Sequence, residues 1–200
     1  MKLIILGPPG AGKGVMSRLI AKKHRLKHVS VGDLIREEID KKTVLGKKIK
    51  KEVNKGIMIS DQDFLKILKK HMPKNNFILD GAPRVIKQKK IVDKLFTPDK
   101  VIILKLPKRI AIKRISTRYE CPKCERVYGG EIKPKRRGYC DKCNVKLIKR
   151  LDDSSKKTIK HRFEVYKKQS KPVEKLYKDA IRINANTHPY KMLKAIEKKL

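Results

Sequence analysis

Apolar positions along the chain fall into short continuous runs separated by longer stretches of helical spacing. Continuous runs at 3–6, 76–80, 100–106 and 180–183 predict buried strands, and 27–31 is a shorter strand candidate. Helical spacing fills most of the chain between them. Because strands that alternate with helices form parallel sheets covered on both faces, the pattern predicts an α/β fold with a five-stranded parallel sheet.

An inserted lobe is predicted between the first two long strands. Three short helical segments, 34–39, 44–53 and 64–70, precede the strand candidate at 76–80. A simple crossover between parallel strands needs fewer helices than this. The extra segments therefore predict a helical lobe that projects from the sheet.

A glycine-rich turn follows the first strand candidate directly. Residues 7–14 read Gly-Pro-Pro-Gly-Ala-Gly-Lys-Gly, with the G-x-x-x-x-G-K spacing of a phosphate-binding P-loop, and helical spacing comes next. The glycines let main-chain N–H groups point at an anion, and the helix N-terminus and Lys13 add positive charge. Gly14 and Val15 stand where a Ser or Thr hydroxyl would hold Mg²⁺.

Asp80 ends the strand candidate at 76–80. A carboxylate at the carboxyl end of a strand beside a P-loop suits a Walker-B-type role, in which it orients Mg²⁺ and its waters. A helix cap is an equally good interpretation of Asp80 by itself.

All four cysteines lie between residues 119 and 150, as Cys121, Cys124, Cys140 and Cys143. The spacing C-x₂-C-x₁₅-C-x₂-C is typical of a Cys₄ zinc site, and four protein ligands leave no open position, so the metal would be structural. Two disulfides are the alternative, which a cytosolic chain disfavours. With little core of its own, this segment would fold around the metal and act as a lid on hinges.

The overall charge is strongly positive: 55 Lys plus Arg against 20 Asp plus Glu give a formal net charge of +35. Such a charge is compatible with a nucleic-acid partner. The basic residues are spread along the whole chain, however, and the 5% of aromatic residues form no stacking platform. We therefore expect solvated lysine-rich faces, with incidental RNA or DNA binding at low salt.

No apolar run approaches the roughly 20 residues of a membrane span, and the first residues do not read as a signal peptide. We expect no membrane partner, a cytoplasmic location and a monomer.

Together these features resemble an adenylate kinase of the zinc-lid type, within the P-loop nucleoside monophosphate kinases. The resemblance covers essentially the whole chain. Its anchors are the P-loop, Gly32-Asp33 with Arg36, residues 80–84 with Gln88, Arg114 with Arg118, the four cysteines, and Asp152-Asp153 with Arg162. It implies transfer of a phosphoryl group from MgATP to AMP, giving two ADP, with Zn²⁺ in the lid. It also implies a three-layer core at 1–29, 60–118 and 151–200, a monophosphate-binding lobe at 30–59 and a lid at 119–150.

The resemblance implies roles for individual residues. The catalytic group is Lys13, Asp80, Arg84, Arg118, Arg150 and Arg162. ATP would be bound by Gly10, Ala11, Gly12, Lys13, Gly14, Val15, Arg114, Arg118, Val127, Tyr128 and His188. AMP would be bound by Val31, Arg36, Ile57, Met58, Ile59, Gly81, Ala82, Pro83, Arg84, Gln88, Arg150 and Arg162.

Phosphoryl transfer is compatible with a site that has several arginines and no catalytic His or Cys. Two polyanions must be brought together, so the site needs concentrated positive charge. The acceptor phosphate has a second pKa of about 6 and is already mostly ionised at neutral pH. Catalysis then needs positioning and electrostatics rather than a general base.

Four positions depart from the family pattern. Val15 and Val31 stand where threonines are usual, Ala82 replaces a Phe, and His188 replaces a common Lys. The changes at Val31 and Ala82 leave open a kinase of another nucleoside monophosphate. The charge of +35, the cysteine module and the missing P-loop hydroxyl leave open an ATP-dependent RNA-binding or ribosome-assembly factor.

Overall fold

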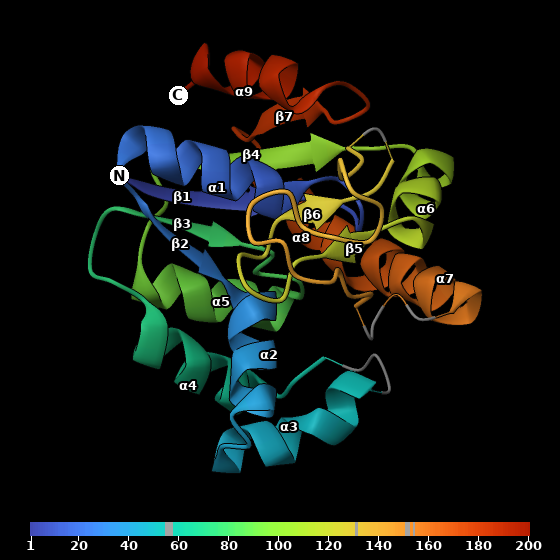
Figure 1. Cartoon of the computed structure of the whole chain (residues 1–200). Helices are drawn as coiled ribbons and strands as arrows, with labels where there is room; N and C mark the ends of the chain where they lie inside the picture. Colours follow the sequence, from blue (N-terminus) through green and yellow to red (C-terminus); the bar gives the residue numbers. More distant parts are fainter. Residues whose placement is uncertain (55–57, 131, 151–152, 154) are drawn as a thin grey trace.

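A computed structural model describes residues 1–54, 58–130, 132–150, 153 and 155–200 of the chain (Figure 1). A five-stranded parallel sheet lies at its centre, with strand order β2-β3-β1-β4-β7. These strands are β1 Lys2–Leu6, β2 Lys27–Ser30, β3 Phe77–Asp80, β4 Lys100–Lys105 and β7 Ile181–Asn184. The predicted parallel sheet is confirmed.

β1 is the middle strand, and its side chains alternate between two hydrophobic cores. Leu3 and Ile5 face one core, and Ile4 and Leu6 face the other. The first core is covered by α1 Lys13–His24 and α9 Pro189–Glu197, and the second by helices that include α4 Asp61–His71 and α5 Ile86–Leu95. Figure 1 shows these two helix pairs on opposite sides of the sheet, which gives the predicted three layers.

The predicted inserted helices are α2 Val31–Asp40, α3 Val44–Asn54 and α4. The Ser30 hydroxyl accepts a hydrogen bond from the Asp33 N–H at 3.3 Å and caps α2. This cap ends strand β2 at Ser30, so Val31 is helical, whereas the sequence pattern included Val31 in the strand. In Figure 1, α2 and α3 project away from the sheet.

The cysteine segment follows α6 Lys108–Ser116 and contains a small antiparallel hairpin, β5 Tyr119–Glu120 with β6 Val127–Tyr128. Its core is a small cluster of its own, built on Cys121, Tyr128, Cys140 and Leu147.

The C-terminal helical region differs from the sequence prediction at both ends. The pattern predicted a helix from Asp152-Asp153 that breaks at Pro172. Asp152 lies outside the described residues, and α7 begins at Lys156 and ends at Val165, with Ser155 as its cap. The chain does not break at Pro172. It passes through a π-helical turn, η2 Tyr166–Ser170, into α8 Lys171–Lys175. Pro172 has no N–H for the usual bond to the preceding turn, and a wider π turn accommodates that loss.

Among the described residues, no helix has both the length and the apolar character needed to cross a membrane.

Candidate active site

A cavity of about 1150 Å³ opens at the carboxyl ends of β1, β2 and β3. The P-loop, the first turn of α2, the lid hairpin and α7 also contribute to its walls. In open parallel sheets, ligands bind in the crevice beyond the carboxyl ends of the strands. The topology therefore places the P-loop at the position expected of a ligand site.

The cavity brings together nearly all of the predicted site residues. Those lining it are Gly10, Ala11, Gly12, Lys13, Gly14, Val15, Val31, Arg36, Met58, Ile59, Asp80, Gly81, Ala82, Pro83, Arg84, Gln88, Arg114, Arg118, Val127, Tyr128, Arg150 and Arg162. Ile57 lies outside the described residues. His188 is not part of the lining, although its neighbours Thr187 and Pro189 are. Its ring nitrogen Nδ1 accepts a hydrogen bond from the Tyr190 N–H at 3.4 Å, and the two rings stack.

The P-loop conformation requires glycine at two positions. Gly7 has φ +141° and Gly10 has φ +78°. A Cβ on Gly7 would lie 2.6 Å from the Leu104 carbonyl oxygen, and one on Gly10 would lie 2.8 Å from that of Ala111. Any side chain here would push the loop away from β4 and α6.

The Lys13 side chain bonds back to the start of its own P-loop. Its Nζ donates to the carbonyl oxygens of Gly7 at 2.8 Å and of Pro8 at 2.9 Å. Removal of the ammonium from water lowers the pKa of Lys13 to about 7. The carboxylates of Asp80 and Glu174 act against this effect, and the guanidinium groups of Arg84 and Arg162 add to it.

Asp80 is buried at the end of β3, beside the start of the P-loop helix. Its Oδ2 lies 3.1 Å from Nε2 of His28 on the neighbouring strand. A Cβ at Gly14 would lie only 3.4 Å from the same oxygen, so the carboxylate and the helix N-terminus are close neighbours. The cap of α5 is Val85, so Asp80 does not cap that helix. This position fits the coordination of Mg²⁺ through water.

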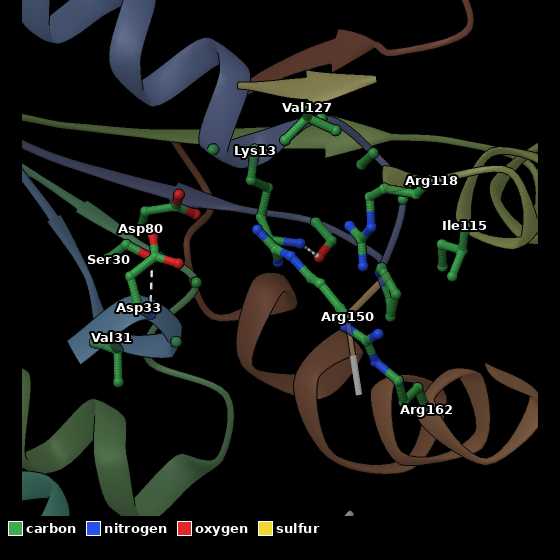
Figure 2. Close-up of a pocket in the computed structure, with 18 of the residues that line it drawn as sticks. Lys13, Ser30, Val31, Asp33, Asp80, Ile115, Arg118, Val127, Arg150 and Arg162 are labelled. Atoms are coloured by element: carbon green, nitrogen blue, oxygen red, sulfur yellow. Dashed lines mark hydrogen bonds between the residues drawn. The ribbon is translucent and has the colours of Figure 1, made fainter. Parts of the chain in front are cut away.

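Three arginines enter the cavity together. In Figure 2, Lys13 lies between Asp80 on one side and Arg118, Arg150 and Arg162 on the other. These arginines come from the turn after α6, from the end of the cysteine segment and from α7. The sheet and the helices therefore concentrate positive charge around Lys13.

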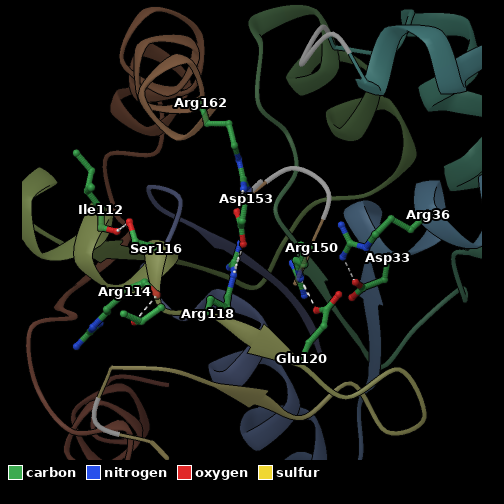
Figure 3. Close-up of polar contacts among 11 residues, drawn as sticks. Asp33, Arg36, Ile112, Arg114, Ser116, Arg118, Glu120, Arg150, Asp153 and Arg162 are labelled. Carbon is green, nitrogen blue, oxygen red and sulfur yellow. Dashed lines mark hydrogen bonds and ion pairs between the residues drawn. The ribbon is translucent and has the colours of Figure 1, made fainter. Parts of the chain in front are cut away.

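Each of the arginines drawn in Figure 3 around the cavity has a carboxylate partner, apart from Arg114. Asp153 is 1% exposed and lies between two of them. Its Oδ2 is 2.8 Å from Nε and 2.6 Å from Nη2 of Arg118, and its Oδ1 accepts from Nη1 of Arg162. One buried carboxylate thus fixes two guanidinium groups.

Two further pairs lie nearby: Arg150 donates to Glu120, and Arg36 donates to Asp33. Burial alone would raise the pKa of Asp33, but the charge of Arg36, the hydroxyl of Ser30 and the charge of Arg150 hold it below its usual range. Asp33 is therefore an ionised partner for these guanidinium groups at neutral pH.

Gln88 links the predicted AMP residues to one another. Its buried side chain accepts a hydrogen bond through Oε1 from the Arg84 N–H at 2.9 Å, and Nε of Arg84 donates to the Gly81 carbonyl at 2.6 Å. Ala82 and Val31 are buried in the same apolar cluster. The amide predicted to read the base also holds the backbone of the arginine predicted to bind the phosphate.

Sequence reasoning assigned no role to several polar residues that the structure brings to the site: His28, Asp33, Glu120, Asp153, Tyr166 and Glu174. Asp33 and Asp153 belong to motifs that carry the resemblance, although no role was predicted for either. The partners of the other four residues are distant in sequence or lie across a helix turn, so no short motif marks these four. The only local signal is the scarcity of acidic residues, 20 against 55 basic ones, which makes each carboxylate near a motif worth testing.

The four cysteine sulfurs lie within 4.8 Å of one another, with 3.6 Å between Sγ of Cys124 and Sγ of Cys140. All four are free thiols, so the disulfide alternative is wrong. Sulfurs around Zn²⁺, each at about 2.3 Å, form a tetrahedron of this size.

The pKa values of the thiols are also compatible with a bound cation. Burial would raise the pKa of the Cys140 thiol, but the Tyr128 hydroxyl and backbone N–H groups lower it to about 6. A hydrogen bond with Cys124, together with burial, raises the pKa of Cys143 to about 12. The four sulfurs cannot all be thiolates without a compensating charge, which a divalent ion would provide.

A P-loop that faces paired arginines across one cavity is typical of P-loop kinases, where positioning and positive charge carry the chemistry. Within that class, the chain belongs to the adenylate kinase family, whose sequence model matches residues 5–182.

Individual relatives agree with the family match. Over 189 residues the chain is 38% identical to the adenylate kinase of Clostridium tetani, covering 90% of this chain and 87% of that protein. It is 41% identical to the adenylate kinase of Borrelia garinii subsp. bavariensis over 189 residues, covering 92% and 89%. The adenylate kinase of Kosmotoga olearia is 38% identical over 189 residues, covering 90% and 87%.

Proposed function

We propose that this enzyme transfers the terminal phosphoryl group of ATP to AMP, giving two ADP, inside the cavity at the P-loop. One observation carries the proposal: two sets of groups suited to bind anions open into the same cavity, the P-loop with Lys13 and the pair Arg36 and Arg84. Arg118, Arg150 and Arg162 line it as well. The family match and the named relatives support the same activity.

On the donor side, the N–H groups of residues 10–15 would cradle the ATP phosphates, and Lys13 would exchange its two carbonyl partners for phosphate oxygens. Arg114 would stack on the adenine, and Val127 with Tyr128 would cover the nucleotide from the lid. His188 would contribute only at the edge of the ATP-binding region.

On the acceptor side, Arg36 and Arg84 would bind the AMP phosphate, and Gln88 would hydrogen-bond to the base. The residues around the base would be Val31, Met58, Ile59 and the segment 81–83; Ile57 is expected with them. Because Gln88 also holds the Arg84 backbone, binding of the base and binding of the phosphate would support each other.

The phosphoryl group in transit would be stabilised by Arg118, Arg150 and Arg162, which Asp153 and Glu120 hold in place. Fixed charges aimed at the transferring group lower the barrier without reorganisation at the moment of reaction. Water in the cavity would accept the phosphoryl group, so we expect the lobe and the lid to close before transfer.

Two metal ions fit the residues present. Mg²⁺ bound with ATP would neutralise phosphate charge, and Asp80, supported by His28, would hold it through water. Zn²⁺ in the Cys₄ cluster would be structural and would make the cysteine segment a rigid lid.

We further propose the domain limits 1–29, 60–118 and 151–200 for the core, 30–59 for the lobe and 119–150 for the lid. A monomer in the cytoplasm, with only incidental nucleic-acid binding, is the expected form. Four free thiols suit a reducing compartment.

The test of the function is an assay coupled to ADP formation, with ATP as donor and AMP, CMP, UMP or GMP as acceptor. Turnover with AMP well above the other three is expected. Activity only with another monophosphate would make this chain a different nucleoside monophosphate kinase. No turnover together with salt-resistant RNA binding would favour an assembly factor.

The site assignment has its own test. Arg84→Ala should raise KM for AMP about 10- to 100-fold, because a charged hydrogen bond to phosphate is lost, with KM for ATP little changed. Arg109→Ala, which removes an exposed arginine outside the cavity, is the matched control. Equal effects of both variants would contradict the assignment.

A further inference from the structure

Tyr128 of β6 lies between the cysteine cluster and the cavity. Of the chain's six tyrosines, all of which the structure describes, it is the one that is buried, with 2% of its surface exposed. It packs in the small core of the cysteine segment. Among the described residues, it is the only member of that core that also lines the cavity. Tyr128 is therefore the direct connection between the two places.

The Tyr128 hydroxyl makes its contacts on the side of the cysteine cluster. It donates to Sγ of Cys140 at 3.5 Å and accepts from the Asp141 N–H at 2.8 Å. A tyrosine hydroxyl can do both at once. Groups that hydrogen-bond to metal ligands orient those ligands, and their loss commonly costs about 10- to 100-fold in metal affinity. The hydroxyl thus fixes one of the four sulfurs and the backbone next to it.

The hairpin of β5 and β6 also carries groups that belong to the nucleotide site. Val127 precedes Tyr128 in β6, and side chains alternate along a strand, so Val127 faces away from the cysteine cluster and lines the cavity (Figure 2). Glu120 is the partner of Val127 across the hairpin, and its carboxylate accepts from Nε of Arg150. A shift of the hairpin would therefore move both Val127 and the carboxylate that directs Arg150.

The residues that follow Tyr128 pack against the turn that carries Arg118. A Cβ on Gly129 would lie 2.5 Å from the Thr117 carbonyl oxygen and 3.0 Å from Cα of Arg118. The Gly130 N–H donates to the Thr117 hydroxyl at 3.1 Å. Backbones packed this closely shift together rather than separately. The position of Tyr128 is therefore linked to that of Arg118 as well.

We propose that Tyr128 is a positioning residue that couples metal binding at the cysteine cluster to ATP binding in the cavity. The proposal rests on the proposed function, since it assigns Zn²⁺ to the cluster and the hairpin to ATP. When Cys140 is fixed as a ligand, the Tyr128 hydroxyl is fixed too, and β6 keeps the position that covers the nucleotide. ATP held under β6 favours metal binding in return, because coupling between two sites is reciprocal.

Tyr128→Phe tests the coupling, because it keeps the ring and removes only the hydroxyl. Competition with a chromogenic chelator measures the Kd for Zn²⁺, with and without a non-hydrolysable ATP analogue and Mg²⁺. In the wild type the analogue should lower the Kd for Zn²⁺ about 5-fold. In the variant the Kd without the analogue should be about 10-fold higher than in the wild type. The analogue should then change it less than about 2-fold, because the connection is lost.

The reverse measurement is the Kd of the analogue for the zinc-loaded proteins, obtained by titration calorimetry. It should be about 5-fold higher for Tyr128→Phe than for the wild type, the same factor as above, with KM for AMP unchanged. Tyr139→Phe is the matched control. It removes a hydroxyl next to Cys140, from a ring that lies 3.9 Å from the Arg136 guanidinium, and should follow the wild type in both measurements. The control also reports any Zn²⁺ that the analogue itself binds.

The outcomes separate the two proposals. A variant that binds Zn²⁺ more weakly but responds to the analogue as the wild type does would show that Tyr128 only supports the cluster, and this overturns the coupling. A wild type that binds no Zn²⁺, or whose Zn²⁺ affinity ignores the analogue, overturns it as well. In each of these cases, turnover of ATP with AMP leaves the proposed phosphoryl transfer standing. The predicted coupling without turnover of any monophosphate supports the role of Tyr128 and overturns the function.

Discussion

At the scale of single residues, the arginines of the site are paired with carboxylate or carbonyl oxygens. The arginines that would act on phosphate do not stand in the cavity as isolated charges, because each has a fixed direction set by a carboxylate or a carbonyl. Asp153 is the clearest case, since it is almost fully buried and contacts both Arg118 and Arg162. Removing such a carboxylate leaves two buried cations that repel each other.

Asp153→Asn should therefore lower kcat about 100-fold, with a smaller effect on KM, because two guanidinium groups lose their direction toward the transferring phosphoryl. Steady-state kinetics with ATP and AMP measure this effect, and thermal melting reports the accompanying loss of stability. Asp179→Asn, at an exposed position, is the control. A variant that melts lower but keeps its kcat would show that Asp153 is structural only.

At the scale of elements, the inserted lobe is tied to the core through Glu38 of α2. This buried carboxylate accepts a bond from Lys70 of α4 at 2.6 Å and another from Thr43. α3 also packs tightly against α2, since a Cβ on Gly46 would lie 1.9 Å from the Glu38 carbonyl oxygen. A polar contact thus joins α2 to α4, and α3 packs against α2 beside it.

Glu38→Gln should lower the free energy of unfolding by about 1–2 kcal/mol at pH 7, because the ion pair with Lys70 is lost. The loss stays this small because Lys70 is mostly exposed and regains water. Bonds from Lys70 and Thr43 hold the pKa of Glu38 at about 2, below its usual value. A depressed pKa in the folded state gives stability above the unfolded value of about 4.3 that is lost as pH falls toward 2.

Urea denaturation between pH 7 and pH 3 tests this linkage. The difference between wild type and Glu38→Gln should shrink steadily below about pH 4.5. Glu37→Gln, on the exposed side of the same helix, should show little difference throughout. A gap that stays constant with pH would rule out an electrostatic origin.

The cysteine segment gives a second prediction at this scale. Its small cluster is separate from the two cores that cover the sheet. Removing the metal with a chelator should therefore lower turnover and produce an early melting transition before the sheet unfolds. Added Zn²⁺ should reverse both changes. Unchanged stability and turnover after verified metal removal would show that the Cys₄ site is not structural.

At the scale of the whole molecule, the dominant property is the net charge of +35. The residues that line the cavity include eleven Lys and Arg against five Asp and Glu, so the cavity is itself positive, but most of the excess charge lies elsewhere on the chain. Charge of this kind binds any polyanion weakly and without sequence preference.

We expect RNA to bind at low salt and to weaken more than 100-fold between 50 and 300 mM salt, equally for unrelated sequences. Fluorescence anisotropy with two unrelated oligonucleotides measures this, and an excess of ATP and AMP should leave binding on the outer surface unchanged. Tight binding of one sequence at 300 mM salt would instead identify a specific RNA partner.

The features that depend on neighbours along the chain could be predicted from the amino-acid sequence alone. Strands, the P-loop, the Cys₄ spacing and the parallel sheet follow from local periodicity and from residue types at fixed intervals. Most of the predicted site residues line one cavity, because a resemblance across the whole chain supplied their order.

The pairing of charges, in contrast, depends on the three-dimensional fold. His28 reaches Asp80 across 52 residues, and Arg118 reaches Asp153 across 35. Glu174 enters the cavity because a π turn precedes it, where the sequence pattern predicted a break at Pro172. These contacts depend on the packing of helices and strands in space, and no local pattern encodes them, because a carboxylate shows no preference for a partner until the fold brings one within reach.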